Sequence, residues 1–422
     1  MTLGVFLLFF LVGFQAPGPR PGRAANSALA QEDEVRAQEP PQELSRERLA
    51  SMIGRHALGP GEVRFLRVVD EKSGRPYFVY TSLDADLQGW ALETLSHANV
   101  HAAAVVALNP TDGRILAMAG HEEGKTTANM ALASAFPAAS VFKIVTAAAA
   151  METTHMTGNT SLAYDGRPHT LYKQHLRAGL FSGRNLVSLK ESFAKSINVV
   201  FGKLGAQALG PRVLEEFARR FYFNRPIRFE MPVEPSDFFL LGKDTYSLAE
   251  LASGYNRTTL LSPLHGALLA AIVANDGVLM EPSVVREVYN EDREVCYRHQ
   301  PAALGRVVSS RTAGEMKDLM EATVSEGTAR ATFRDRLRHP VLSKLCLGGK
   351  SGSINDDEGR RVDWFVGFAE PEGSSDRLVM AAVVVHHRQT LGLRALKIVR
   401  EGVIHYYEPR LSNAYASRGK GR

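Results

Sequence analysis

The chain has 422 residues, of which 45% are hydrophobic and 23% charged, with 36 glycines and 20 prolines. This composition excludes collagen-like, low-complexity and wholly disordered proteins, and it leaves enough apolar residues for a large core. The formal charge is +5, but the surplus comes from basic residues near the two ends of the chain, which are Arg20, Arg23, Arg410, Arg418, Lys420 and Arg422. The body between them is close to neutral, so the sequence does not predict a basic face for nucleic acid.

The first 30 residues have the features of a targeting segment. Residues 3–14 (LGVFLLFFLVGF) are uncharged and apolar, but the run is too short for a comfortable membrane span, which needs about 20 residues. Residues 28–30 (ALA) supply the small-x-small pattern that a signal peptidase accepts. No basic residue precedes the apolar run, so a cleaved signal peptide and an uncleaved signal anchor both stay open. With either, residues 1–30 predict export.

We divide the rest of the chain into three parts. Residues 31–75 begin rich in Glu, Gln, Arg and Pro and are interpreted as a linker or stalk, although the pattern turns strand-like near Arg64. Residues 76–410 show no internal repeat and no long linker, so we expect one domain there. Residues 411–422 form a short basic tail, which we expect to be a frayed terminus.

Early in the domain, strand and helix patterns alternate. The apolar spacing of residues 83–97 (LDADLQGWALETLSH) suits an amphipathic helix. Residues 100–108 and 114–119 are apolar runs separated by the turn-forming NPTDG, which predicts a hairpin. Residues 140–151 (SVFKIVTAAAAM) are apolar around the whole circumference apart from three polar residues. A helix of this kind must be buried on all sides.

Later segments complete the predicted fold. Helices joined by loops are expected over residues 186–275, and short apolar runs return as strands at 345–349, 362–368 and 378–386. Early strands, a helical middle and late strands predict an α+β domain whose sheet is assembled from both ends of the chain.

The polar residues of the 140–151 helix are the first candidates for chemistry. A lysine at the centre of an apolar helix loses its hydration, so the fold must pair it or let it become neutral. Lys143 lies three positions after Ser140, so the two side chains project from one face at the start of the helix. A lysine with a lowered pKa can take the proton of a serine hydroxyl, which then becomes a nucleophile.

The Ser-x-x-Lys pattern is weak on its own, because chance gives roughly one or two copies in a chain of this length. A second copy, Ser192 and Lys195, lies in an ordinary amphipathic helix pattern and illustrates such a coincidence. Supporting signals are therefore needed before the first copy is interpreted.

Two further polar clusters supply that support. Ser196 and Asn198 offer a hydroxyl and an amide, which could shuttle a proton and hold a substrate carbonyl. Lys350, Ser351 and Gly352 follow an apolar strand. A cation, a hydroxyl and a glycine at a strand edge suit a substrate that lies along the strand and ends in a carboxylate.

In this order, Ser-x-x-Lys, Ser-x-Asn and Lys-Ser-Gly resemble the motif set of penicillin-binding proteins and serine β-lactamases. The surroundings resemble the transpeptidase domain of penicillin-binding proteins over about residues 76–400. The segments that carry the likeness are LDADLQ (83–88), ALNPTDGRILAMAG (107–120), FPAASVFKIVTAAAAME (136–152), SEGTAR (325–330), GGKSG (348–352) and DWFVGFAE (363–370). The resemblance implies an antiparallel sheet built from N- and C-terminal strands and packed against helices, with a helical subdomain inserted between them.

The resemblance also implies roles for the first two motifs. Ser140 would be acylated by a peptide that ends in D-Ala-D-Ala, with Lys143 as its general base. Ser196 and Asn198 would relay the leaving-group proton and bind the peptide. β-Lactams would acylate Ser140 because they mimic that peptide.

The third motif would bind the substrate. Lys350 and Ser351 would hold the terminal carboxylate, with Gly352 beside them. The backbone N–H groups of Ser140 and Ser353 would form the oxyanion hole, a donor pair that stabilises acyl-transfer transition states. No metal and no organic cofactor is implied.

The implied setting is the periplasm or the outer face of the bacterial inner membrane, with peptidoglycan stem peptides as substrates. A glycosyltransferase domain would not fit in this length, so we expect a monofunctional enzyme whose partner is a separate glycan polymerase. Two features depart from the family pattern. Lys-Ser-Gly replaces the commoner Lys-Thr-Gly, and Ala138-Ala139 stands where many members have a glycine before the nucleophile.

Three alternatives share the motifs. A D,D-carboxypeptidase differs only in whether water or an amine attacks the acyl-enzyme. A β-lactamase is disfavoured, because no Glu after Asn198 has an Asn four residues on, as class A would require, and the class D pattern has an apolar residue at that position. A non-catalytic penicillin-binding scaffold or sensor is disfavoured because all the motif side chains are present. The acceptor peptide and a role in elongation, division or sporulation stay open.

Three other features carry less weight. The Gly349-Lys350-Ser351 run is not the end of a phosphate-binding loop, because position 344 is Lys where that motif requires Gly. His386 and His387 are adjacent and would point to opposite faces of a strand, so no metal site is expected there. Cys296 and Cys346 could pair, but free thiols are favoured.

Overall fold

The computed structural model describes residues 44–54, 64–123, 125–126, 129–240, 242, 244–387 and 392–419. The contacts divide the chain into residues Met1–Pro40 and Pro41–Arg422, and the description concerns the second unit. The targeting segment predicted at residues 1–30 therefore lies outside the described residues, as does the first part of the predicted stalk.

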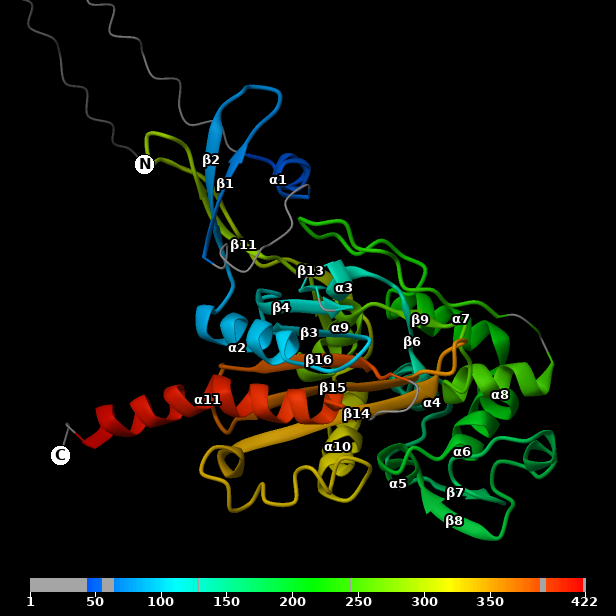
Figure 1. The fold of residues 1–422 in the computed structure, drawn as a ribbon. Helices are drawn as coiled ribbons and strands as arrows, with labels where there is room; N and C mark the ends of the chain where they lie inside the picture. The colour runs from blue at the N-terminus through cyan, green and yellow to red at the C-terminus, as the bar shows by residue number, and fades with distance from the viewer. Residues whose placement is uncertain are drawn as a thin grey trace, which may run out of the picture. The chain divides into compact units, whose positions relative to one another are not determined.

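A six-stranded antiparallel sheet forms the centre of this unit (Figure 1). Its strand order is β14 (Leu345–Asn355), β15 (Arg361–Pro371), β16 (Leu378–Val385), β3 (Ala102–Leu108), β4 (Ile115–Glu122) and β5 (Lys125–Thr126). The early strand β3 pairs along its whole length with the late strand β16, with Val383 opposite Ala104. The predicted sheet built from both ends of the chain is confirmed.

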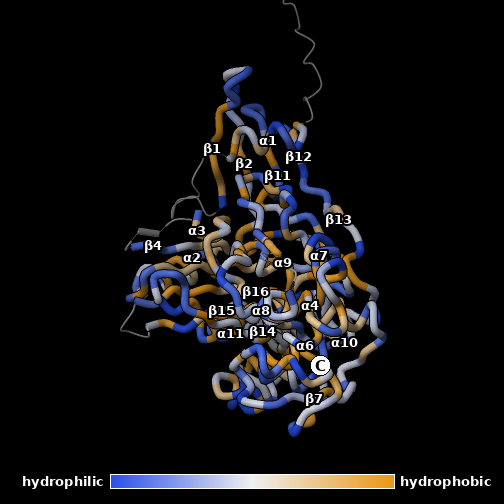
Figure 2. The backbone as a smooth tube through the Cα atoms, turned by 90° about the vertical axis from the view of Figure 1, so that its right-hand side faces the viewer, coloured by the Kyte–Doolittle hydropathy of each residue, from blue (hydrophilic) through white to orange (hydrophobic). Residues whose placement is uncertain are grey.

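Helices cover both faces of this sheet, and this is why β3 and β16 are apolar at every position and buried throughout. On one face lie α2 (Ala85–Ser96) and α11 (Ala395–Gly419). On the other lie α9 (Pro263–Ala274), α10 (Ser310–Ser325) and α4 (Lys143–Thr154). Hydrophobic segments gather in the middle of the unit, around α9 and β16 (Figure 2).

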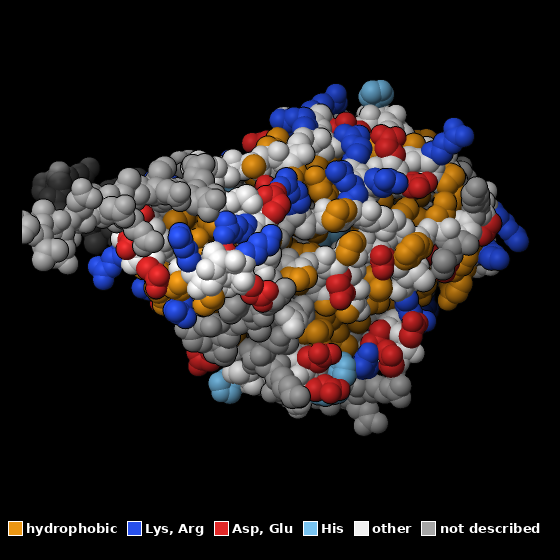
Figure 3. Space-filling view, turned by 90° about the horizontal axis from the view of Figure 1, so that it is seen from above, with side chains coloured by type: hydrophobic (Ala, Val, Ile, Leu, Met, Phe, Trp, Pro, Cys, Tyr) orange, Lys and Arg blue, Asp and Glu red, His pale blue; other side chains and the backbone are white. Residues whose placement is uncertain are grey.

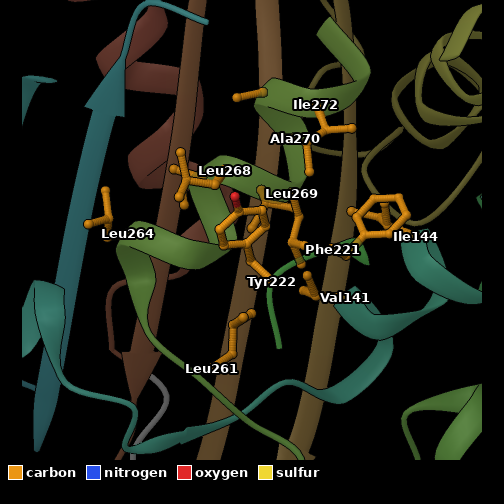
Figure 4. Close-up of a cluster of buried hydrophobic side chains, with 14 of the residues drawn as sticks. Val141, Ile144, Phe221, Tyr222, Leu261, Leu264, Leu268, Leu269, Ala270 and Ile272 are labelled. Atoms are coloured by element: carbon orange, nitrogen blue, oxygen red, sulfur yellow. The ribbon is translucent and has the colours of Figure 1, made fainter. Parts of the chain in front are cut away.

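Helix α9 is the core element of the second face. All of its 12 residues are buried, because Leu, Ala, Ile and Val surround the helix axis. Leu264 and Leu268 from α9 lie in one apolar cluster with Val141 and Ile144, which come from the start of α4 and the turn before it (Figure 4). The segment that carries Ser140 and Lys143 is thereby packed directly on the core.

The predicted helical middle is also confirmed. Its helices are α5 (Leu189–Ala194), α6 (Asn198–Lys203), a π-helical turn (Leu204–Leu209), α7 (Gly210–Arg220) and α8 (Thr245–Ser253). Shorter elements accompany them, namely α3 (Asn129–Leu132), β6 (Phe136–Pro137), the hairpin β7 (Ser161–Tyr164) and β8 (Asn185–Ser188), β9 (Leu260–Leu261), and 3-10 turns at Lys173–Leu176 and Leu342–Lys344. After this region, β10 (Val278–Met280) and β13 (Ala303–Arg306) form a two-stranded sheet.

A second sheet includes residues that we predict to be part of a linker or stalk over residues 31–75. Its strand order is β1 (Phe65–Val69), β2 (Pro76–Thr81), β11 (Val285–Tyr289) and β12 (Val295–Arg298). Helix α1 (Arg46–Ile53) buries Leu49 and Ile53 in the main core. The described parts of the predicted stalk are therefore folded, and the expected boundary at residue 76 falls inside the β1–β2 hairpin.

The C-terminal tail also differs from its expected boundary. Helix α11 runs through residue 410 and continues to Gly419. Among the described residues, no helix is both long enough and apolar enough to cross a membrane. Basic and acidic side chains are interspersed on the face seen from above (Figure 3), in keeping with the nearly neutral body.

Candidate active site

The segment before Ser140 is fixed by three neighbouring elements. β6 pairs with β9, and the Ala138 N–H donates to the Thr259 carbonyl at 2.8 Å. From β15, Trp364 Nε1 donates to the Pro137 carbonyl at 2.9 Å. A 3-10 turn (Ala139–Phe142) then carries Ser140 and leads into α4, which begins at Lys143. The predicted helix is present, with its first turn wound more tightly than expected.

Lys143 lies at the centre of the site. Its side chain is fully buried, and Nζ lies 2.7 Å from Ser140 Oγ, 2.8 Å from Asn198 Oδ1 and 2.6 Å from the Ser253 carbonyl oxygen. These three contacts come from three different segments, so the lysine joins α4, α6 and the end of α8. Two of the partners can only accept a hydrogen bond, whereas the Ser140 hydroxyl can also donate one.

The surroundings of Lys143 favour its neutral form. Burial, and then the nearby charge of Lys350, lower the pKa of Lys143 well below its usual value. A neutral amine has two N–H donors and one lone pair. It can donate to Asn198 Oδ1 and to the Ser253 carbonyl while its lone pair accepts the O–H of Ser140. The three partners thus match the hydrogen-bonding capacity of a neutral lysine that acts as a base towards Ser140.

Ser196, in the turn between α5 and α6, and Asn198, the first residue of α6, lie across from Lys143. Ser196 adopts a left-handed backbone conformation, with φ of 56°, and this turn brings both residues into the site. Besides accepting from Lys143, Asn198 donates from Nδ2 to the His169 carbonyl at 2.9 Å. The amide is therefore held in one orientation by partners on both sides.

The Lys-Ser-Gly motif lies within β14, the edge strand of the central sheet. Lys350 is fully buried, donates to the Ser351 carbonyl at 3.0 Å and lies 5.3 Å above the Phe193 ring. Burial lowers the pKa of Lys350 to about 7. Ser351 Oγ lies 2.6 Å from Thr328 Oγ1. The unpaired edge of β14 leaves backbone groups available to an extended ligand.

Gly352 and Ser353 complete the strand edge. A Cβ at Gly352 would lie 3.1 Å from Val141 Cγ2 and 3.3 Å from the Ala138 carbonyl oxygen, so β14 packs closely on the segment that carries Ser140. Ser353 Oγ is buried and has no hydrogen-bond partner among the described residues. This hydroxyl is available to a bound ligand.

All eight predicted site residues meet at one hollow of about 450 Å³. Six of them line it, namely Ser140, Ser196, Asn198, Ser351, Gly352 and Ser353. Lys143 contacts Ser140 directly, and Lys350 is the strand neighbour of Ser351. A larger hollow of about 710 Å³ lies at the other end of β14 and contains none of the eight residues.

The backbone before Ser140 is strained. Ala139 has φ of 47°, a left-handed conformation that favours glycine. Gly254, the C-cap residue that follows α8, lies directly against it, since a Cβ at Gly254 would fall 1.9 Å from the Ala139 carbonyl oxygen. Many family members have a glycine before the nucleophile. In this chain Ala139 stands there, and a glycine at this position would relieve the strain.

Sequence reasoning missed part of the lining. The hollow is also bordered by His169, Gly254, Tyr255, Thr328, Arg361, Asp363, Trp364, Arg394 and Leu396. Thr328 and Trp364 fall in segments that carry the family resemblance, and that signal could have identified them. Arg361 and Arg394 lie in no such segment, and no local pattern distinguishes them from other surface arginines.

The remaining sequence candidates lie apart from the site. Ser192 Oγ donates to the Ser188 carbonyl and Lys195 pairs with Glu191, so the second Ser-x-x-Lys copy forms ordinary helix contacts. Cys296 and Cys346 are both free, as favoured. No group of three or more His, Cys, Asp or Glu side chains in the described part of the chain could hold a metal ion.

A serine hydroxyl against a buried lysine, on an α+β scaffold with Ser-x-Asn and Lys-Ser-Gly beside it, defines the class of penicillin-binding proteins and serine β-lactamases. The family model for the penicillin binding protein transpeptidase domain matches residues 103–401. The chain therefore belongs to the penicillin-binding protein transpeptidase family.

Similarity to individual proteins agrees with this assignment. Stage V sporulation protein D of Bacillus subtilis is 23% identical over 304 residues, which are 68% of this chain and 45% of the relative. Peptidoglycan D,D-transpeptidase PbpA of Mycolicibacterium smegmatis is 29% identical over 313 residues, which are 67% of this chain and 61% of the relative. The chain thus spans between 45% and 61% of the length of these two relatives.

One solved structure shows the fold. The D,D-transpeptidase domain of a peptidoglycan glycosyltransferase from Eggerthella lenta superposes with a TM-score of 0.64 at 24% identity. The match covers 79% of this chain and 83% of that domain. The predicted α+β architecture is confirmed by this likeness.

Proposed function

We propose that this chain is a serine D,D-transpeptidase that cross-links peptidoglycan stem peptides through an acyl-enzyme on Ser140. The observation that carries the proposal is the 2.7 Å contact between Ser140 Oγ and Lys143 Nζ, in a site where burial lowers the pKa of the lysine. Membership of the transpeptidase family supports the same reaction.

In the first step, Ser140 Oγ attacks the carbonyl carbon of the penultimate D-alanine, and its proton passes to the neutral amine of Lys143. The C–N bond to the terminal D-alanine then breaks. Ser196 lies in the same hollow and relays a proton to the departing amine, while Asn198 holds the peptide. The products are an ester on Ser140 and free D-alanine.

The substrate lies along the edge of β14. The terminal carboxylate binds to the Ser351 hydroxyl, which Thr328 orients, and the charge of the buried Lys350 beside it attracts the carboxylate. Gly352 allows close approach of the ligand backbone. The N–H groups of Ser140 and Ser353 stabilise the developing oxyanion.

In the second step, the amine of an acceptor stem peptide attacks the ester and releases Ser140. The single carboxylate among the residues that line the hollow is that of Asp363, and both of its oxygens accept hydrogen bonds, from Arg394 and from the Ala395 N–H. It is therefore not free to activate a water molecule. This arrangement supports a long-lived acyl-enzyme and disfavours a β-lactamase.

Intact-mass spectrometry of the purified full-length chain with penicillin G tests the first step. We expect a persistent adduct of one drug mass, lost in Ser140→Ala and kept in Ser192→Ala, the matched serine of the second Ser-x-x-Lys copy. Folded protein with neither adduct nor drug hydrolysis would overturn the catalytic proposal and favour a scaffold. Rapid hydrolysis without an adduct would favour a β-lactamase.

A product assay separates transpeptidation from carboxypeptidation. The full-length chain is given a stem pentapeptide together with an amine acceptor, and the products are separated by mass. A cross-linked dimer supports the proposal, whereas trimmed tetrapeptide alone would identify a D,D-carboxypeptidase.

The proposal includes an extracytoplasmic location, in the periplasm or at the outer face of the inner membrane, because stem peptides are found there. The apolar residues 3–14 support export. A separate glycan polymerase would supply the strands. A reporter that is active only after export, fused behind residue 60, tests the location.

A further inference from the structure

Arg361 lies at the margin of the same hollow as Ser140. It is the first residue of β15 and faces Asn355, the last residue of β14, in the strand register. Its side chain is exposed and borders the hollow together with Asp363. Arg361 is therefore reachable by a ligand that extends along β14.

The acidic side chains around Arg361 are already paired with other arginines. In the β14–β15 turn, Arg360 contacts Asp356 at 2.7 Å and Glu358 at 2.8 Å. On the same turn, Asp357 lies 3.5 Å from the Arg257 guanidinium.

Asp363 is the acidic residue nearest to Arg361 on β15, and it is also fully engaged. Arg394 donates to its two oxygens at 2.7 and 3.0 Å, and the Ala395 N–H adds a third hydrogen bond at 3.2 Å. Arg361 itself forms no ion pair with any residue in the described part of the chain. The Arg361 guanidinium at this end of the hollow is therefore available to pair with a ligand group.

The position of Arg361 along β14 sets where a ligand group would meet it. The terminal carboxylate of the substrate lies at Lys350 and Ser351, and the scissile carbonyl lies between Ser140 and Ser353. Asn355 is two residues further along the strand, which is about 7 Å. The donor peptide upstream of the scissile bond therefore extends toward Arg361, away from the terminal carboxylate.

We propose that Arg361 binds a second carboxylate of the donor peptide, on the part of the chain upstream of the scissile bond. The inference rests on the proposed acylation of Ser140 and adds a substrate class to it: peptides with an acidic group two to three residues before the terminal D-alanine. An arginine suits this role because its planar guanidinium pairs with a carboxylate in bidentate geometry.

Two penicillins provide a matched pair of probes. Carbenicillin is penicillin G with one additional carboxylate on the side-chain carbon, and that side chain occupies the place of the upstream peptide. The measurement is the second-order rate constant of acylation of the full-length chain by each drug. The readout is the rate constant for carbenicillin divided by that for penicillin G. A variant that slows acylation by both drugs equally leaves this ratio unchanged.

We expect Arg361→Ala to lower this ratio about fivefold, the size of an exposed charge pair, and Arg361→Glu to lower it further. Arg361→Lys should give a ratio between those of Arg361→Ala and the wild type. Addition of 0.5 M NaCl should reduce the wild-type ratio, because salt screens exposed charges. The control is Arg286→Ala, an exposed arginine on β11 in the other sheet, which should keep the ratio.

An unchanged ratio in Arg361→Ala, or an equal fall in Arg286→Ala, would overturn the inference while acylation itself persists. Failure of both drugs to acylate the folded wild-type chain is a different result. That outcome would overturn the proposed function, and the assignment of Arg361 with it.

Discussion

Two lysines, Lys143 and Lys350, are buried at one site, and opposite protonation states suit their roles. In the proposed mechanism Lys143 is neutral so that it can accept the proton of Ser140, whereas Lys350 is charged so that it can attract a carboxylate. Burial lowers the pKa of both, that of Lys350 to about 7 and that of Lys143 well below its usual value, with the charge of Lys350 as the second cause. The site therefore has a limited working range of pH.

This arrangement predicts a bell-shaped dependence of the acylation rate constant on pH. The rate falls in acid as Lys143 becomes protonated, and it falls above about pH 7 as free Lys350 loses its charge. The measurement is the second-order acylation rate by penicillin G across pH. In Lys350→Arg the alkaline limb should disappear, because a guanidinium stays protonated. A limb that persists in that variant would assign it to another group.

Ala139 and Ala138 offer a matched test of strain beside the nucleophile. Ala139 has φ of 47°, whereas Ala138 has φ of −62° in the right-handed region. Replacement by glycine removes one buried methyl group at either position, but only at Ala139 does it relieve a left-handed conformation that costs about 1–2 kcal/mol.

We therefore expect Ala139→Gly to have a higher free energy of unfolding than Ala138→Gly by about 1–2 kcal/mol, measured by urea denaturation. Equal values would show that the 139 backbone stores no strain. The reverse order would show that the Ala139 methyl group contributes more by packing than its backbone costs.

The residue scale also shows how far the sequence predicts the site. The spacing of Ser140 and Lys143 indicated their pairing, because one helical turn fixes it locally. The third partner of Lys143, the Ser253 carbonyl, comes from the end of α8. A backbone carbonyl has no sequence signature, and only the tertiary fold brings it to the lysine.

At the scale of elements, β14 shows why functional segments are predicted poorly. The apolar pattern predicted a strand over residues 345–349, yet the strand continues to Asn355. Its second half contains the polar sequence KSGSIN, which lacks strand periodicity because its side chains serve the site rather than the core. Local rules fail most often at such positions.

Helix α1 is joined to the body by a cluster of charges. Arg46 contacts Glu230 at 3.0 Å and Glu281 at 2.6 Å, and the Glu230 side chain is 0% exposed. Removal of one partner of a buried pair leaves the other charge without compensation. We expect Arg46→Met to lower the free energy of unfolding by about 3 kcal/mol, measured by urea denaturation.

Arg228 provides the matched control for this cluster. It pairs with Glu47 and Glu281, but its side chain is 61% exposed. Exposed pairs contribute little, so Arg228→Met should cost less than about 1 kcal/mol. Similar losses in the two variants would mean that burial of Glu230 does not set the strength of the α1 attachment.

At the scale of the whole molecule, the two sheets differ in how far the sequence predicts them. The central sheet follows from apolar runs at both ends of the chain. The N-terminal sheet depends on the pairing of β2 with β11, in which Tyr80 faces Glu287. The sequence pattern turns strand-like near Arg64, but a local pattern does not show which distant segment a strand pairs with, so residues up to 75 are assigned to the stalk.

The stability of the whole unit should depend on pH through His265 in α9. This side chain is fully buried, its Nε2 lies 2.6 Å from the Phe221 carbonyl, and burial lowers its pKa to about 4. In the unfolded chain His265 binds a proton near pH 6.5, whereas in the folded chain burial prevents protonation until the pH is near 4. The contribution of His265 is therefore complete above pH 6.5 and is lost as pH falls to about 4.

We expect the wild-type chain to lose about 3 kcal/mol through this group between pH 6.5 and 4, measured by urea unfolding. His265→Gln keeps an N–H donor but cannot titrate, so its stability should fall less over the same range. His97→Gln, at an exposed position on the other side of the sheet, should follow the wild type. If His265→Gln also followed the wild type, the acid sensitivity of the core would have to come from groups outside α9.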